Sequence, residues 1–166
     1  MVADTLLIDA FGRIKEVVHQ VVRGLGKDDL AFRPTPSANS IGWLVWHLTR
    51  IQDDHIAGVA QQKQVWHTGW AQRFSLPFAN DDTGYGHSSK EVGAVQVDAG
   101  LLLGYYDAVH EATIAYLQGL KDEDYDRIVD SNWNPPVTLG VRLISVITDD
   151  LQHAGQAAYV RGLLSD

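Results

Sequence analysis

The chain has 166 residues, of which 45% are hydrophobic and 20% charged, a composition typical of a single globular domain over residues 1–166. The formal net charge is −8 and no cluster of Lys and Arg stands out, which argues against a nucleic-acid partner and an anionic membrane surface. Cysteine is absent, so disulfides, thiolate metal ligands and a cysteine nucleophile are excluded, and any metal must bind to His, Asp or Glu.

The N-terminal stretch Met1–Ala10 carries two aspartates and no apolar run, so no signal peptide is expected. No apolar run in the sequence approaches the roughly 18 residues of a membrane span. We therefore expect a cytoplasmic protein.

Apolar residues at three- and four-residue steps predict the first two helices. One runs from about Asp4 to Gly24, before the segment Arg33–Pro36, whose prolines cannot continue a helix. The next begins after Asn39 or Ser40, both good N-caps, and runs to about residue 60. The stretch 61–89 combines aromatic residues with Gly and Pro and is predicted to be a long ordered loop that can include one short helix.

The third helix is predicted from Ser88 or Ser89 to about Leu120, although Gly93, Gly100 and Gly104 each cost roughly 1 kcal/mol relative to alanine. Residues 122–138 are predicted to be loop, and the fourth helix runs from about 139 to 164. The fold class is therefore all-α, a four-helix bundle. The long loop can cross the length of the bundle, so the second and third helices can be parallel.

The fourth helix carries a carboxylate and an imidazole on one face. Asp149 and His153 are four residues apart, so they lie one turn apart on a stripe that should point into the core. A buried carboxylate is costly unless it is paired or bound to metal, and two ligands at this spacing can chelate one ion. The alternatives are a hydrogen-bonded or solvent-facing Asp–His pair, and Asp150 as the carboxylate in place of Asp149.

His47 on the second helix is the candidate third ligand. It borders the apolar face of that helix, where a satisfied core histidine is the alternative interpretation. Three ligands from two helices would leave coordination positions open for water or substrate, as a catalytic metal site requires. Asp54 and His55 lie two turns further along, near the same face, and are candidate pocket or second-layer groups.

Three stretches carry a resemblance to a known family: Ile41–Leu48 (IGWLVWHL), Asp81–His87 (DDTGYGH) and Asp149–Gln156 (DDLQHAGQ). They resemble the DinB-like helical superfamily, which includes mycothiol-dependent maleylpyruvate isomerase and the mycothiol and bacillithiol S-transferases. The last stretch is the most specific, because its histidine is followed by a small residue and a glutamine. Together the stretches span nearly the whole chain.

The resemblance implies a four-helix bundle in up-down-down-up order, with metal ligands that fall on His47, Asp149 and His153. The sequence departs from the family at Asp149, where His or Glu is usual. Because Asp is one methylene shorter than Glu, the ion would sit closer to the fourth helix, bind more weakly or be absent. Two histidines and a carboxylate suit zinc, which we favour, and also nickel or iron.

The resemblance also implies an activity: family members join a low-molecular-weight thiol to an electrophile or use the thiol to isomerise a double bond. The metal would bind the thiol sulfur and favour its reactive thiolate form. The sequence has five Lys and eight Arg and is rich in Ala, Gly, Val and Asp, which favours mycothiol over bacillithiol or glutathione as co-substrate. Alternatives are an isomerase of the maleylpyruvate type and a non-enzymatic metal-binding stress-response bundle. Dimers are common in the family, so a homodimer is possible.

Four aromatic and imidazole side chains are candidates for the mouth of the thiol-binding pocket: Trp46, Trp70, Tyr85 and His87. For each of them, ordinary core or loop packing is the alternative. Arg50 and Arg161 can pair with a carboxylate on a substrate, although solvated positions on helix faces are the favoured interpretation.

Overall fold

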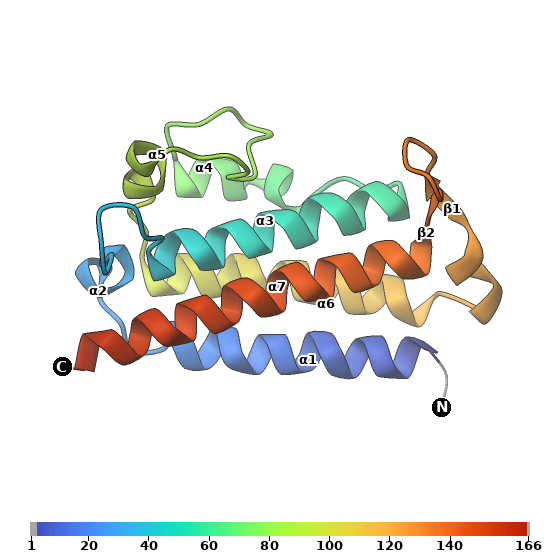
Figure 1. The fold of residues 1–166 in the computed structure, drawn as a ribbon, viewed down its shortest axis with the longest axis horizontal. Coiled ribbons are helices and arrows are strands. Elements are labelled where there is room, and N and C mark those ends of the chain that lie inside the picture. Colours follow the sequence, from blue (N-terminus) through green and yellow to red (C-terminus); the bar gives the residue numbers. More distant parts are fainter. Residues whose placement is uncertain (1–2, 166) are drawn as a thin grey trace.

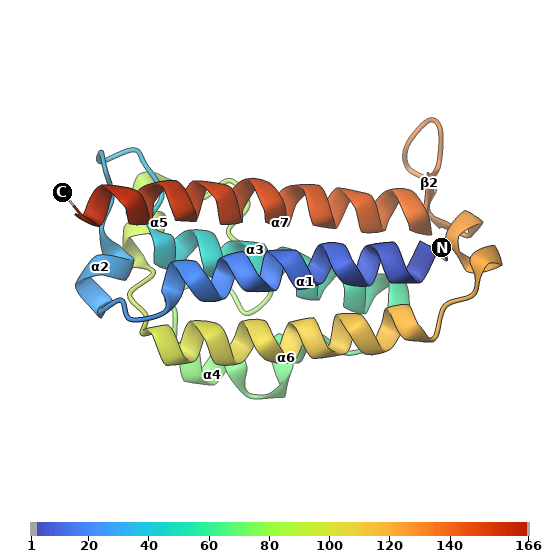
Figure 2. The same cartoon turned by 90° about the horizontal axis from the view of Figure 1, so that it is seen from below.

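Four long helices form the body of the protein. The structure is a computed structural model that describes residues 3–165. The helices are α1 (Ala3–Val22), α3 (Ile41–Ala60), α6 (Ala99–Gln118) and α7 (Leu139–Gly162). Figures 1 and 2 show α3 and α6 running in the same direction, with α1 and α7 running the opposite way. The all-α class and the up-down-down-up order are therefore confirmed.

Shorter elements connect these helices. They are α2 (Lys27–Ala31), η1 (Val65–Thr68), α4 (Trp70–Phe74), α5 (Ser89–Ala94), η2 (Asp122–Asp126), β1 (Ile128–Asp130), β2 (Val137–Thr138) and the terminal turn η3 (Leu163–Ser165). β1 pairs with β2 in an antiparallel hairpin just before α7, within a segment that the sequence predicted as loop. None of the helices among the described residues is long and apolar enough to cross a membrane.

The predicted third helix is broken, so its prediction as one continuous element was wrong. α5 ends at Ala94, and Asp98 caps a new helix by accepting a hydrogen bond from the backbone N–H of Leu101 at 2.8 Å. Between the two helices, Val95 and Val97 are both buried. Residues two apart point to the same side only in an extended chain, so burying both valines requires the break.

α3 is the most enclosed helix, because every residue from Ile41 to Arg50 is buried. Ser40 caps it by accepting from the backbone N–H of Trp43 at 3.1 Å, so the predicted start of this helix is confirmed. The helix packs against α6 and α7, and the segment between α3 and α6 lies across its remaining face (Figure 1). An imidazole at position 47 is therefore held inside the protein at the boundary with α7.

Candidate metal centre

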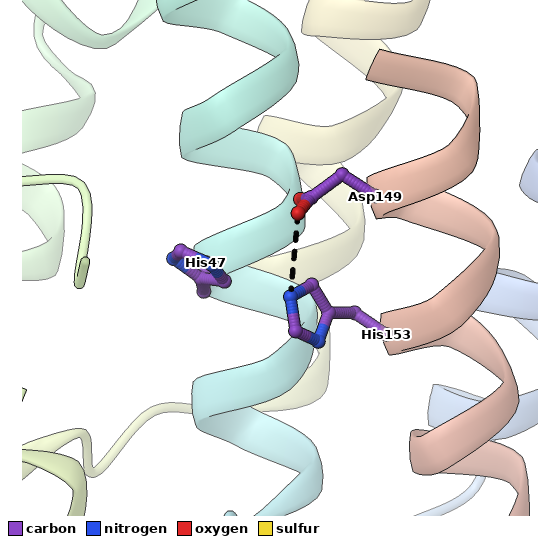
Figure 3. Close-up of side chains that lie close together, drawn as sticks. All are labelled: His47, Asp149 and His153. Atoms are coloured by element: carbon purple, nitrogen blue, oxygen red, sulfur yellow. Dashed lines mark ion pairs between the residues drawn. The ribbon is translucent and has the colours of Figure 1, made fainter. Parts of the chain in front are cut away.

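His47 from α3 meets Asp149 and His153 from α7 at the boundary between these two helices (Figure 3). One potential ligand atom from each residue lies within 4.8 Å of the other two. Nε2 of His153 lies 3.6 Å from Oδ1 of Asp149. The two imidazole rings are 4.9 Å apart between centroids and nearly perpendicular, at 75°. These three residues, called the triad below, therefore converge on one point.

Burial differs among the members of the triad, because they lie at the rim of the α3–α7 contact. His47 is buried, whereas Asp149 and His153 are half-buried. On α7 the neighbouring positions Val146 and Ala154 face the core. The triad thus has protein on one side and solvent access on the other, as a site that admits a ligand requires.

The ring orientation of both histidines is fixed by carbonyl acceptors. The Nδ1–H of His47 donates to the backbone oxygen of Thr83 at 2.5 Å. The Nδ1–H of His153 donates to Oε1 of Gln156 at 3.1 Å, one turn further along α7. Each ring therefore keeps its Nε2 lone pair free of hydrogen. Metal-binding histidines are typically held by this kind of hydrogen bond from the second ring nitrogen.

The loop Asp81–His87 supplies the acceptor for His47, and Gly84 allows the close approach. Gly84 has φ of +90°, and a Cβ there would lie 3.0 Å from Nδ1 of His47. The Asp82 carboxylate accepts from the backbone N–H of Gly84 at 2.7 Å and from Nε2–H of His87 at 3.1 Å. This network holds the loop, called the covering loop below, closed over α3.

Burial lowers the pKa of His47 and the neighbouring His153 lowers it further, against the raising effect of the Thr83 hydrogen bond. The imidazole of His47 is therefore neutral at neutral pH, the form that can bind a metal. Oδ2 of Asp149 is buried and accepts no hydrogen bond from any residue that the structure describes. An unsatisfied buried acceptor costs about 1–3 kcal/mol, which a cation at this point would offset. The triad therefore offers two imidazole nitrogens and a carboxylate, a donor set suited to a divalent metal, and it lacks a cation to balance the carboxylate.

Of the two candidate carboxylates, Asp149 lies beside the histidines and Asp150 does not. The side chain of Asp150 is fully buried near Tyr106 on α6, where burial raises the pKa of the tyrosine hydroxyl and Asp150 raises it further. Burial raises the pKa of Asp150 well above its ordinary value, and the charge of Asp149 raises it further. Asp150 is thus a buried core residue and not a member of the triad.

The sequence model of the mycothiol-S-transferase family (MST) matches residues 6–166. The chain belongs to the mycothiol-S-transferase family. A crystal structure described as a conserved protein from Enterococcus faecalis has the same fold, with a TM-score of 0.91 and 31% identity over 97% of this chain and 96% of that one. No functionally curated protein matches the chain. The resemblance to DinB-like proteins is therefore confirmed.

The predicted pocket residues of this mycothiol-S-transferase family member are divided between two places. Trp46 is buried and stacks on His87, whose side chain is 4% exposed, with ring centroids 5.8 Å apart. Both nitrogens of His87 are bonded within the protein, one of them accepting from Nε1–H of Trp43 at 3.1 Å. Trp70 packs against Tyr105 on α6, whereas Tyr85 is 90% exposed. The structure thus packs Trp46 against His87 of the covering loop, leaves Tyr85 of the same loop exposed to solvent, and places Trp70 against α6.

The two arginines considered as substrate-binding groups are bonded within the protein, so their interpretation as solvated residues was wrong. Arg50 is fully buried and donates to the backbone oxygen of Asp82 at 3.1 Å, which ties α3 to the covering loop. Arg161 donates to the backbone oxygens of Val21 and Arg23, at 2.5 and 3.0 Å, and so closes the end of α1. Both side chains stabilise contacts between distant segments.

Sequence reasoning missed three groups that shape the triad. Trp43 stacks on His47 with ring centroids 4.6 Å apart, and its position one turn earlier on α3 was a visible signal. Gln156 is three residues after His153, so its hydrogen bond could have been predicted from the same rule. The backbone oxygen of Thr83 has no comparable signal, because it depends on how a loop 36 residues further along the chain folds back.

Proposed function

We propose that this chain is a divalent-metal-dependent transferase that joins mycothiol to an electrophilic small molecule. Zinc is the favoured metal, with nickel and iron as alternatives. Family membership supports the transfer of mycothiol. One structural observation supports the metal: two histidines with Nδ1 bonded to carbonyl oxygens face a carboxylate whose buried oxygen lacks a partner among residues 3–165.

In this proposal His47, Asp149 and His153 hold the ion. When bound, a divalent ion would favour the thiolate form of a thiol that reaches it. His47 and His153 each offer a neutral Nε2, and Asp149 offers one negative charge, so the protein neutralises only part of a divalent charge. Trp43 covers one face of His47 and keeps water from that side. The chain has no cysteine, so the attacking sulfur comes from the co-substrate.

The activity is tested with monochlorobimane as electrophile and mycothiol as thiol, with and without zinc. The carbon–sulfur bond forms as chloride leaves, and the thiol proton passes to solvent. We expect a zinc-dependent rate above the uncatalysed background. If no zinc-dependent rate is found with several thiols and electrophiles, the transferase proposal is wrong. Maleylpyruvate is assayed in parallel, because a thiol-dependent isomerase would use the same three residues.

The metal assignment is tested separately from activity. The variant His153→Ala should lose most of the bound zinc, because it removes one of three ligands. His19→Ala is the matched control, since the His19 side chain is exposed to a similar degree but pairs with Asp107 between α1 and α6. Metal content of both purified variants is measured by atomic emission. Full zinc content in His153→Ala would exclude this histidine as a ligand.

A further inference from the structure

Two pockets flank the triad, one on each side. The first, called the polar pocket, has a volume of about 440 Å³ and is lined by charged and small residues that include Asp54, His55, Gly58, Arg127, Asp130 and Arg142. The second, called the apolar pocket, has a volume of about 510 Å³ and is lined by residues that include Pro34, Ala38, Leu44, Gly155, Tyr159 and Val160. Both volumes fall in the range of about 300–1,000 Å³ that is typical of sites for small molecules.

The pockets and the triad form one line along the boundary between α3 and α7. On α7, Arg142, Asp149 and Gln156 follow at intervals of two helical turns, so they lie on one side of the helix. Arg142 lines the polar pocket and Gln156 the apolar pocket, with the triad between them. On α3, which runs the opposite way (Figure 1), Asp54 lies two turns beyond His47. At 1.5 Å per residue, the polar pocket lies roughly 10–12 Å from the triad.

The apolar pocket adjoins the triad directly. Gln156, which accepts the hydrogen bond from Nδ1–H of His153, is itself part of the wall of this pocket. Leu44, another wall residue, lies one turn before His47 on α3. A molecule in the apolar pocket can therefore place a reactive carbon at the triad while most of its surface remains in contact with carbon atoms.

The wall of the polar pocket offers both donors and acceptors. Arg142 donates to Nδ1 of His55 at 3.0 Å and to the carboxylate of Asp130 at 3.1 Å, which leaves three of its five N–H donors for other partners. Because His55 accepts at Nδ1, its Nε2 carries a hydrogen and can also donate. The carboxylates of Asp54 and Asp130 supply acceptors. An apolar body would lose free energy by stripping water from this wall, whereas a body rich in hydroxyl groups could replace the water.

We infer that the two pockets separate the two substrates, an inference that rests on the function proposed above. The polar pocket binds the hydroxyl-rich sugar and inositol part of mycothiol, and its cysteinyl sulfur reaches the triad. The apolar pocket binds the apolar body of the electrophile. The new carbon–sulfur bond then forms between the pockets, with the electrophile's leaving group released and the thiol proton passed to solvent.

Two glycines allow each pocket to be filled separately, and a third provides a control. Gly58 lines the polar pocket and Gly155 the apolar pocket, and within residues 3–165 no atom lies within 4 Å of a Cβ built on either one. A Cβ at either position enters open space, so we expect the variants Gly58→Leu and Gly155→Leu to extend into the pockets, and replacing a helical glycine favours the helix. Gly162 on α7 has similar open space among the described residues and lines neither pocket, so Gly162→Leu is the control.

Steady-state kinetics with mycothiol and monochlorobimane distinguish the pockets. Gly58→Leu should raise KM for mycothiol about tenfold or more and leave KM for monochlorobimane unchanged. It should also leave the rate with N-acetylcysteine unchanged, because that thiol lacks the sugar and inositol. Gly155→Leu should raise KM for monochlorobimane and leave KM for mycothiol unchanged. The control should match the wild type. Equal effects of both variants on both substrates, or effects in the opposite sense, would overturn the inference.

Binding measurements separate a failure of this inference from a failure of the proposed function. S-methyl mycothiol has no free thiol and tetramethylbimane has no leaving group, so calorimetry with each reports binding without turnover. If the wild type binds both, and each variant loses only its expected ligand, the assignment of the pockets stands even where no conjugation occurs. If the wild type conjugates but the variants do not separate the ligands, the assignment is wrong and the proposed function stands. Absence of binding by both ligands would also overturn the assignment.

Discussion

Gly84 and Gly86 together test how the covering loop reaches the triad. Both have left-handed backbones, with φ of +90° and +76°. A Cβ at Gly84 would lie 2.8 Å from the ring of Trp46 and 3.0 Å from Nδ1 of His47, whereas at Gly86 it would meet nothing within 4 Å among the described residues. Gly86→Ala therefore measures backbone strain alone, and Gly84→Ala measures the same strain plus a collision with rigid rings.

The expected magnitudes follow from these two contributions. Left-handed backbone costs an alanine about 1–2 kcal/mol, so Gly86→Ala should lower the free energy of unfolding by that amount. Overpacking adds about 1–3 kcal/mol, so Gly84→Ala should cost about 2–5 kcal/mol in total. Moving Thr83 away from His47 should also weaken zinc binding by about 10–100-fold, the usual effect of losing a partner of a ligand, while Gly86→Ala leaves it unchanged.

Urea unfolding of the metal-free variants gives the stability difference, and competition with a chromophoric chelator gives the zinc affinity. The two quantities separate a structural effect from an effect on the triad. Costs that agree within about 0.5 kcal/mol, together with equal zinc affinities, would refute the claim that Gly84 permits the approach of the loop to His47.

Three further predictions concern single side chains. Gln156→Leu should weaken zinc binding about 10–100-fold while Gln156→Glu retains most of it, as the chelator competition would show; equal affinities would contradict the hydrogen bond's role. Asp149→Asn should lose bound zinc and Asp150→Asn should keep it, and the reverse result in metal analysis would exchange their roles. Burial lowers the pKa of His110 below its unfolded value of 6.5, so the unfolded chain takes up the proton first and stability should fall as pH decreases through 6.5. His110→Gln should reduce that loss in urea titrations at pH 7.5 and 5.5, and an unchanged difference would contradict this pKa assignment.

The four long helices could be predicted because their signals are local. Apolar residues recur at helical steps through Ala3–Val22 and Ile41–Ala60, and serine caps the second of these as expected. The break between Ala94 and Ala99 could not be predicted in the same way. Valines at positions 95 and 97 fit a helix or an extended segment equally well, and only packing against the rest of the bundle selects the extended form.

In the candidate site, too, contacts between residues close in the sequence could be predicted, and contacts between distant residues could not. The spacing of Asp149 and His153 fixes their common face on α7, and the structure places them 3.6 Å apart. Their meeting with His47 depends on the pairing of α3 with α7, for which the sequence offered only family resemblance. Asp149 stands where the family usually has His or Glu, and its side chain is one methylene shorter than that of Glu. In this fold the shorter carboxylate still lies within 4.8 Å of both imidazoles.

Both histidines of the triad have the same tautomer, but the acceptors that fix it come from different parts of the chain. Gln156 lies on the same helix as His153, so their hydrogen bond can form as soon as α7 does. His47 depends on Thr83, whose loop is held by Arg50 and by the Asp82 carboxylate. Opening of that loop would release Nδ1 of His47 and leave the α7 pair intact. In the proposed function, the affinity of the triad for a metal would therefore be coupled to the closure of the loop through His47.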